Sequence, residues 1–344
     1  MNIQSIKPII LGIESSCDDT SAAVLVGNQI KSNIIASQKV HESYGGVVPE
    51  LASRAHQQHI VPVINEALKQ ANLTLNQVDG IAFTQGPGLL GSLLVGTSFA
   101  KSLSLATNVP LIAVNHMEGH VLAHFIQEND EQAVPAFPFL CLTVSGGHTQ
   151  LVKISSPLHM EVVGATIDDA AGEAFDKAAK MLGLPYPGGP LVDKHAKSGN
   201  PHAFEFPIPN MDELNFSFSG LKTSFLYFLK KQVKLNEDFV KENLNDLCAS
   251  MQHTIVTAVL NKLTEAAKKL NINEIAIAGG VSANSYLREE LKKLATENNW
   301  NLFIPKFEYC TDNAAMIAIA GKYKFEQQQF ATLNTTPNPR LKIS

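Results

Sequence analysis

The sequence contains few cysteines, and they lie far apart. Cys17, Cys141, Cys248 and Cys310 are the four cysteines of the chain, and no two of them form a Cys-x-x-Cys pair. Disulfide-stapled domains and thiolate zinc sites need paired or closely spaced cysteines, so the sequence predicts neither. This cysteine usage is typical of a protein in a reducing cytoplasm.

Long apolar runs are also absent. The apolar part of residues 1–14 is too short for a secretory signal core or a membrane span. Every later apolar stretch is interrupted by glycine, proline or charge. We therefore expect a cytoplasmic protein that has no membrane partner.

The chain has no excess of positive charge. Its formal net charge is −5, which argues against a protein that coats nucleic acid unaided, because phosphate neutralisation drives such binding. An RNA partner would have to meet a local basic patch or a second protein. Lys230, Lys231, Lys234 and Lys241 do cluster, although such a run is also typical of the solvated face of a helix.

Two segments have the same strand–turn–strand pattern. Residues 9–30 read as an apolar strand, a polar turn at Ser15–Thr20 and a second strand, and residues 139–154 repeat that plan around a Ser-Gly-Gly turn. At 344 residues the chain is long enough for two cores. The sequence therefore predicts two domains of similar architecture.

Between and after these hairpins, strands alternate with helices, which predicts an α/β protein with mostly parallel sheets. We expect a first lobe at 1–130, completed by a helix near 311–327, a second lobe at 131–310, and a loosely held tail at 331–344. Two facing lobes of this kind would leave a nucleotide cleft between them. This plan resembles the duplicated actin-like and sugar-kinase-like ATPase fold.

The segment NHMEGHVLAH predicts a metal site. If it is helical, His116 and His120 lie on one face with Cβ atoms about 5–6 Å apart, and His124 continues that face. Asp312 is the best third ligand by type, and two histidines with one carboxylate suit iron or zinc. A zinc protease needs Glu directly after the first histidine, whereas the acid here is Glu118. Alternatively, the histidines only pack or cap their helix.

Three further segments are candidates for binding a nucleotide. The turn VSGGHTQ offers backbone amides to an oxyanion, although it is also an ordinary hairpin turn. In IAIAGGVSANSYLR, a strand runs through two glycines into a helix, which predicts an anion site at the helix start. The acidic turn CDDT could orient a magnesium ion with the nucleotide, or be structural only. GSLLVGTS is no Walker loop, because Thr97 stands in place of the lysine.

Taken in order, ten blocks of the sequence closely resemble the bacterial tRNA N6-adenosine threonylcarbamoyltransferase family over residues 9–325. They are ESSCDDT, HESYGGVVPELASRAH, GPGLLGSLLVG, NHMEGH, VSGGHTQL, DDAAGEAFDK, YPGGP, FSFSGLKT, GGVSANSYLR and CTDNAA. The resemblance implies transfer of a threonylcarbamoyl group from threonylcarbamoyl-AMP to the N6 amine of the adenosine next to the tRNA anticodon, with release of AMP. It also implies two partners, a degenerate paralogue of the same fold and a small P-loop ATPase.

The same resemblance implies roles for individual residues. His116, His120 and Asp312 would hold one divalent metal ion per subunit. The nucleotide and acyl pocket would be lined by Thr143, Val144, Ser145, Gly146, Gly147, Asp176, Gly189, Asp193 and Asn284. We further predict that Asp18 takes the amine proton. Two other functions stay open: an inactive scaffold paralogue of such a complex, and a small-molecule kinase of the same fold.

Overall fold

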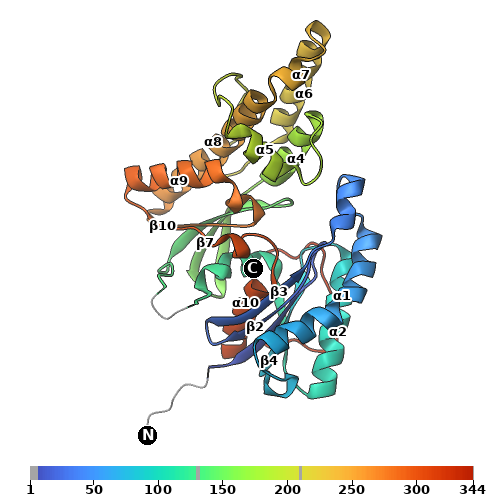
Figure 1. Cartoon of the computed structure of the whole chain (residues 1–344). Helices are drawn as coiled ribbons and strands as arrows, with labels where there is room; N and C mark the ends of the chain where they lie inside the picture. The colour runs from blue at the N-terminus through green and yellow to red at the C-terminus, as the bar shows by residue number, and fades with distance from the viewer. Residues whose placement is uncertain (1–6, 129–131, 209–210, 344) are drawn as a thin grey trace.

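The computed structural model describes residues 7–128, 132–208 and 211–343. It contains two five-stranded sheets with equivalent strand orders, β3-β2-β1-β4-β5 and β10-β9-β6-β7-β8. Figure 1 shows the two sheets as separate lobes, with α1 and α2 beside the first and α4 to α9 beside the second. The prediction of a duplicated α/β architecture is therefore confirmed.

The first lobe is built from residues before position 126 and one late helix. Its elements are β1 (Ile9–Glu14), β2 (Thr20–Val26), β3 (Gln29–Ala36), η1 (Lys39–Tyr44), α1 (Pro49–Gln70), η2 (Leu75–Gln77), β4 (Gly80–Gly86), α2 (Leu90–Thr107), β5 (Leu111–Asn115), α3 (His116–Leu122), η3 (Ala123–Phe125) and α10 (Ala314–Glu326). The boundary that we expected near residue 130 lies outside the described residues.

The second lobe begins with the second hairpin. Its elements are β6 (Phe139–Val144), β7 (Thr149–Ser156), β8 (His159–Ala165), α4 (Ala171–Met181), α5 (Gly188–Ala196), α6 (Ser219–Leu235), α7 (Phe239–Glu242), α8 (Leu244–Leu270), β9 (Glu274–Ala278), η4 (Gly280–Ala283), α9 (Ser285–Asn298), β10 (Asn301–Phe303) and η5 (Phe307–Tyr309). No helix among the described residues is long and apolar enough to cross a membrane.

Each sheet combines a hairpin with two crossover strands. β1 pairs with β2 in antiparallel fashion and with β4 in parallel fashion, and β6 pairs in the same way with β7 and β9. The sheets are therefore mixed, and the expectation of mostly parallel sheets is wrong, because each hairpin continues into a third antiparallel strand. The carboxyl ends of β1 and β6, where both turns begin, are equivalent points of the two lobes.

Helix α10 lies at the centre of the molecule, as Figure 1 shows. Every residue from Ala314 to Gly321 is buried, which is the pattern of a helix enclosed on all sides. A Cβ atom on Gly12 of β1 would lie 2.8 Å from the Ala318 amide nitrogen, so only glycine permits this close approach. The hydrophobic core around α10 includes Ile10 of the first sheet and Cys141 of the second. One core therefore joins the two lobes.

The C-terminal tail differs from its prediction. The Asn338 amide donates to the Gln85 carbonyl at 2.8 Å, and the Ala331 amide donates to the Leu111 carbonyl at 2.7 Å. The Asn115 side chain donates to the Lys342 carbonyl at 2.8 Å. Proline and asparagine suggested a loosely held segment, but these bonds fix the tail along the ends of β4 and β5.

Candidate functional site

The carboxyl end of β1 places a buried carboxylate at the base of the cleft. Glu14 is the last residue of the strand and is completely buried. It accepts hydrogen bonds from the Thr84 hydroxyl at 2.6 Å, from the Ser16 amide and from His116 Nδ1 at 3.0 Å. A buried carboxylate is stable only when it is hydrogen-bonded or paired, and Glu14 meets both conditions.

Helix α3 presents the predicted pair of histidines. Asn115 caps the helix directly at the end of β5, since its side chain accepts from the Met117 amide at 2.9 Å. His116 and His120 follow one turn apart, with ring centroids 4.7 Å apart and ring planes at 88°. Both side chains are buried. The predicted helix and the shared face of these histidines are thus confirmed.

Asp312 completes the group from the far end of the sequence. Its Oδ1 atom lies 3.3 Å from His116 Nε2 and 3.2 Å from His120 Nε2. The helix expected from Thr311 begins instead at Ala314 behind an Asn313 cap, so Asp312 belongs to the preceding turn. This turn places the carboxylate beside α3.

The three side chains fit a divalent metal ion. Each offers one ligand atom, and these atoms all lie within 4.8 Å of one another. Because His116 Nδ1 donates to Glu14, its Nε2 atom is the one that faces Asp312 and would be the metal-binding atom of the ring. Two imidazoles and one carboxylate leave coordination positions open for a substrate.

Electrostatics also favour a positive charge at this point. Burial opposes charge on His116, but the carboxylates of Asp312 and Glu14 outweigh it and hold the pKa of the ring well above its usual value. Burial likewise acts to raise the pKa of Asp312, yet the adjacent positive charge of His116 holds it well below its usual range. The two carboxylates therefore favour a positive charge on the His116 ring, and a metal ion bound at Nε2 would take the place of the proton there.

Two other residues of this helical segment have different roles. His124 Nε2 donates to the Ile277 carbonyl at 2.9 Å, and burial lowers the pKa of its ring to about 4. It is a neutral histidine that ties η3 to β9, not a metal ligand. Glu118 faces Lys324 of α10 at 3.6 Å, away from the histidine pair.

The acidic turn after β1 is held from two helices. His56 of α1 donates from Nε2 to the Cys17 carbonyl at 3.0 Å, and the Ser92 hydroxyl of α2 donates to the same oxygen at 2.9 Å. Burial, followed by the negative charge of Asp312, raises the pKa of Asp18. Burial and then the charge of Asp18 raise the pKa of Asp19 to about 7.

A cavity of about 320 Å³ in the second lobe collects several predicted nucleotide-binding residues. It is lined by Gly146, Asp176, Gly189, Asp193 and Asn284, together with neighbouring residues of α4, α5 and η4. This volume is at the small end of the range of ligand pockets. The segments that were singled out from the sequence thus converge on one cavity.

The turn after β6 forms one wall of that cavity. A Cβ atom on Gly172 at the start of α4 would lie 2.8 Å from Gly146 Cα, so the helix and the turn meet through glycine alone. His148 of the turn has its pKa lowered by burial and then by the positive charges of His116 and His120. The turn therefore lies within electrostatic reach of the histidine pair across the cleft.

Four of the predicted lining residues, at positions 143–145 and 147, do not line this cavity. The Thr143 hydroxyl is buried and donates to the Gln150 carbonyl at 3.2 Å, and Val144 packs in the hydrophobic core. Ser145 donates its amide to the His148 carbonyl at 2.8 Å, which closes the turn on itself. Gly147 is exposed beside Gly146. Within the turn itself, Gly146 is the residue that lines the cavity.

Two aspartates occupy the helix starts around the cavity. Asp193 Oδ1 accepts from the Ser285 amide at 3.2 Å and from its hydroxyl at 2.8 Å. A carboxylate of the chain itself therefore occupies the start of α9. The prediction of an anion site there is wrong. Asp176 Oδ1 likewise accepts from the amides of Gly188 and Gly189 at 2.9 and 3.1 Å. Both carboxylates are fixed. Asp176 keeps its second oxygen for ribose or amine groups, whereas the second oxygen of Asp193 faces the Lys197 ammonium at 3.9 Å.

Comparison with known proteins identifies the family. The family model for tRNA N6-adenosine threonylcarbamoyltransferase (TsaD) matches residues 29–319. The chain belongs to this family. It is therefore a transferase, as the sequence blocks implied.

Relatives and solved structures agree with this assignment. The chain is 61% identical over 334 residues to a protein of that name from Christiangramia forsetii, covering 97% of this chain and 98% of the relative. It is 48% identical to the one from Thermosipho africanus over 97% of this chain and the whole relative. Among solved structures, HypF from T. kodakarensis superposes with a TM-score of 0.63 at 14% identity, over 97% of this chain and 49% of that one. That likeness supports the fold alone.

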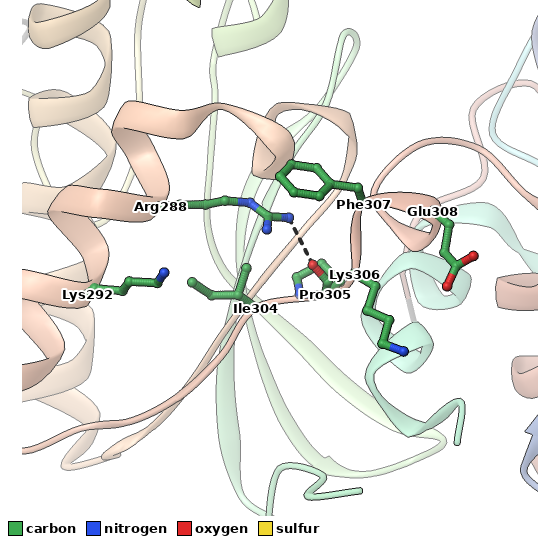
Figure 2. Close-up of a pocket in the computed structure, with 7 residues that line it drawn as sticks. All are labelled: Arg288, Lys292, Ile304, Pro305, Lys306, Phe307 and Glu308. Atoms are coloured by element: carbon green, nitrogen blue, oxygen red, sulfur yellow. Dashed lines mark hydrogen bonds between the residues drawn. The ribbon is translucent and has the colours of Figure 1, made fainter. Parts of the chain in front are cut away.

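A second cavity of this transferase lies between α9 and the segment that follows β10 (Figure 2). It measures about 610 Å³ and is lined by Arg288, Lys292, Lys306 and Phe307, among others. Arg288 donates to the carbonyls of Ser282 at 2.6 Å and Pro305 at 2.9 Å, and its guanidinium lies 4.0 Å from the Phe307 ring centroid. Arg288 therefore anchors the segment that leads to Asp312.

Several residues of the transferase site were not predicted. Glu14 lies in the quoted block ESSCDDT, but its place at the end of an apolar strand did not identify it as the partner of His116. His56 and Arg288 bond to backbone carbonyls, which no motif marks. An acidic residue that ends a buried strand was the one signal available from the sequence.

Proposed function

We propose that this chain transfers the threonylcarbamoyl group of threonylcarbamoyl-AMP to the N6 amine of the adenosine on the 3′ side of the anticodon in tRNA. The observation that carries the proposal is the group of His116, His120 and Asp312, whose charges reach the turn that lines the 320 Å³ cavity with Gly146. The family name of its relatives agrees with this reaction.

The donor's adenosine occupies the 320 Å³ cavity in this proposal. Asp176 and Asp193 accept hydrogen bonds from its ribose hydroxyls or base amine. The helix starts bind Oδ1 of each aspartate, which fixes the position of the other carboxylate oxygen. The Gly146 turn donates backbone amides toward its phosphate, because no side chain blocks the approach. The acyl group then extends toward α3.

The reaction is an acyl transfer. The N6 nitrogen attacks the carbamoyl carbon, a C–N bond forms, and the C–O bond to the phosphate breaks so that AMP leaves with the electron pair. The amine proton passes to Asp18, because burial raises the pKa of this carboxyl and makes it a stronger base than an exposed aspartate. Most of the acceleration comes from positioning and from charge stabilisation in the cleft.

His116, His120 and Asp312 would hold the metal ion, either iron or zinc. The ion would supply Lewis acidity toward an anionic oxygen of the donor. Glu14 keeps the His116 ring oriented for this role. These three ligands also argue against the alternative of an inactive scaffold, which has no need for them.

The chain acts in the cytoplasm together with two partners, a degenerate paralogue of its fold and a small P-loop ATPase. The lack of a Walker loop in this sequence is consistent with such a division of labour. Its formal net charge of −5 also favours a tRNA surface that is shared with other subunits.

The test is transfer of label from threonine, bicarbonate and ATP into unmodified tRNA in the presence of the companion enzymes. We expect label to enter the tRNA with the wild-type chain and to be lost with the His116→Ala variant, although that variant folds. Absence of transfer with wild type would favour the scaffold, and label in a small substrate without tRNA would favour a kinase.

A further inference from the structure

A third cavity lies next to the one assigned to the donor and is built from both lobes. It measures about 620 Å³. Tyr44 and Gly45, at the end of η1, line it from the first lobe, whereas Lys180 and Tyr186 line it from the second. Figure 1 shows the start of α1 facing α4 and α5 across the opening between the lobes. The cavity therefore lies between the two lobes.

One carboxylate separates this cavity from the donor cavity. Asp176 lines both of them. Gly188 lines the third cavity and Gly189 the donor cavity, and Asp176 Oδ1 binds the amides of both glycines. Ligands in the two cavities would therefore be direct neighbours. A transfer reaction needs this arrangement for its donor and acceptor.

The lining of the third cavity suits a flat base. Tyr44 is 63% exposed and Tyr186 is half-buried. Unpaired bases of RNA are commonly bound by stacking on aromatic side chains. An exposed tyrosine at a cavity wall has no stabilising role in a core, so it is available to a ligand.

The charges around the cavity favour an amine over a phosphate at its inner end. Tyr186 has its pKa raised to about 12 by burial and then by the negative charges of Asp18 and Asp176, so the acidic turn lies close to its ring. Carboxylates accept hydrogen bonds from an N–H group and repel a phosphate. Lys180 is exposed at the outer side, where no ion pair with another described residue engages it. Lys177, by contrast, is paired with Asp169 at 3.0 Å.

We propose that this cavity is the acceptor subsite, which binds the unstacked adenosine of the tRNA with its base against Tyr44 and Tyr186 and its N6 amine toward the acidic turn. Lys180 meets a flanking phosphate at the rim. The inference rests on the proposed function and assigns the tRNA, its second substrate, to the third cavity. Because Tyr44 comes from the first lobe, the subsite is complete only when both lobes face each other.

The first experiment measures tRNA and AMP separately in single variants. We expect Tyr44→Ala and Tyr186→Ala to lower kcat/KM for unmodified tRNA about tenfold, in line with the loss of one stacked base. AMP binding, measured by calorimetry, stays within about twofold of wild type, since neither tyrosine lines the donor cavity. Tyr44→Phe and Tyr186→Phe keep the rings and retain activity.

A matched control and a direct probe complete the test. Tyr227→Ala removes a tyrosine of α6 that is 66% exposed but lies outside the cavity, and it leaves kcat/KM unchanged. In tRNA with 2-aminopurine at the acceptor position, fluorescence changes on binding to wild type, and the change is lost with Tyr44→Ala. If Tyr186→Ala misfolds, the same two measurements on Tyr44→Ala are sufficient to test the proposal.

The outcomes separate the subsite from the proposed function. If wild type transfers label to tRNA but Tyr44→Ala matches it in kcat/KM, the acceptor subsite is overturned and the function survives. Equal losses in AMP binding and tRNA use would also overturn it, because the tyrosines would then support the donor cavity. If wild type transfers nothing to tRNA, the proposed function itself fails.

Discussion

The two sheets have equivalent strand orders, yet their equivalent turns carry opposite chemistry. The turn after β1 follows a buried Glu14 and contains Asp18 and Asp19, whereas the turn after β6 contains Gly146 and Gly147 and no carboxylate. The first turn supplies charge, and the second supplies open space and backbone amides. In the proposed reaction the duplicated fold divides the work between its halves, with proton and metal chemistry assigned to one side and nucleotide binding to the other.

The largest effect is expected from the charged half. His120→Ala removes one of three metal ligands, so we expect bound metal to fall to near zero and transfer to fall by more than the about 10–100-fold loss typical of outer-shell partners. Metal analysis and the label assay measure this. His124→Gln is the matched control, since His124 bonds to the Ile277 carbonyl. We expect this variant to retain the metal. Equal metal loss in both variants would contradict the assignment of ligands.

The open half is tested by adding a single methyl group. Gly172→Ala places a Cβ atom 2.8 Å from Gly146 Cα, so the turn must move. We expect AMP binding to weaken about tenfold, or about 1.4 kcal/mol, because the displaced turn lines the cavity through Gly146, and we expect metal content to stay unchanged. Gly220→Ala is the control, because nothing lies within 4 Å of its added Cβ. Calorimetry measures the AMP affinity of both variants. If Gly172→Ala binds AMP like wild type, the turn does not contribute to nucleotide binding.

Local patterns predicted much of this division, and long-range contacts did not. Both hairpins were predicted because alternating apolar residues and a turn lie within one short segment. His116 and His120 were found through their spacing on one helix turn. Glu14 was missed as a partner of His116 because the two residues are far apart in the sequence. The tail was misjudged because its order depends on backbone bonds to β4 and β5, which composition does not encode.

The dependence of folding stability on pH tests the acidic turn of the first lobe. The pKa of Asp19 is raised from 3.8 to about 7. The folded chain therefore holds a proton that the unfolded chain releases, and stability falls as pH rises from about 4 to about 7. Asp19→Asn should flatten this fall, by at most about 4 kcal/mol, since each pKa unit between 3.8 and about 7 is worth about 1.4 kcal/mol. Urea unfolding at several pH values measures it. If the variant shows the same dependence of unfolding free energy on pH as wild type, Asp19 does not hold this proton in the folded chain.

The smallest effect concerns the support behind Asp312. Arg288 holds the segment before Asp312 through the Pro305 carbonyl and the Phe307 ring (Figure 2). Lysine keeps the charge but lacks the planar fork that makes these bonds together. Arg288→Lys should therefore weaken metal binding about threefold, which corresponds to about 0.6 kcal/mol and to the loss of roughly one hydrogen bond. Metal titration of the folded chain measures it.

Lys292→Ala is the control for that experiment, since Lys292 lines the same cavity but does not hold the segment. If both variants bind metal like wild type, the turn before α10 is held by its own contacts, above all by the Asn313 cap, whose side chain accepts from the Met316 amide at 3.1 Å. If only Arg288→Lys weakens binding, the second lobe controls a metal ligand of the first. The charged half of the cleft would then depend on the other lobe for its geometry as well as for its substrate.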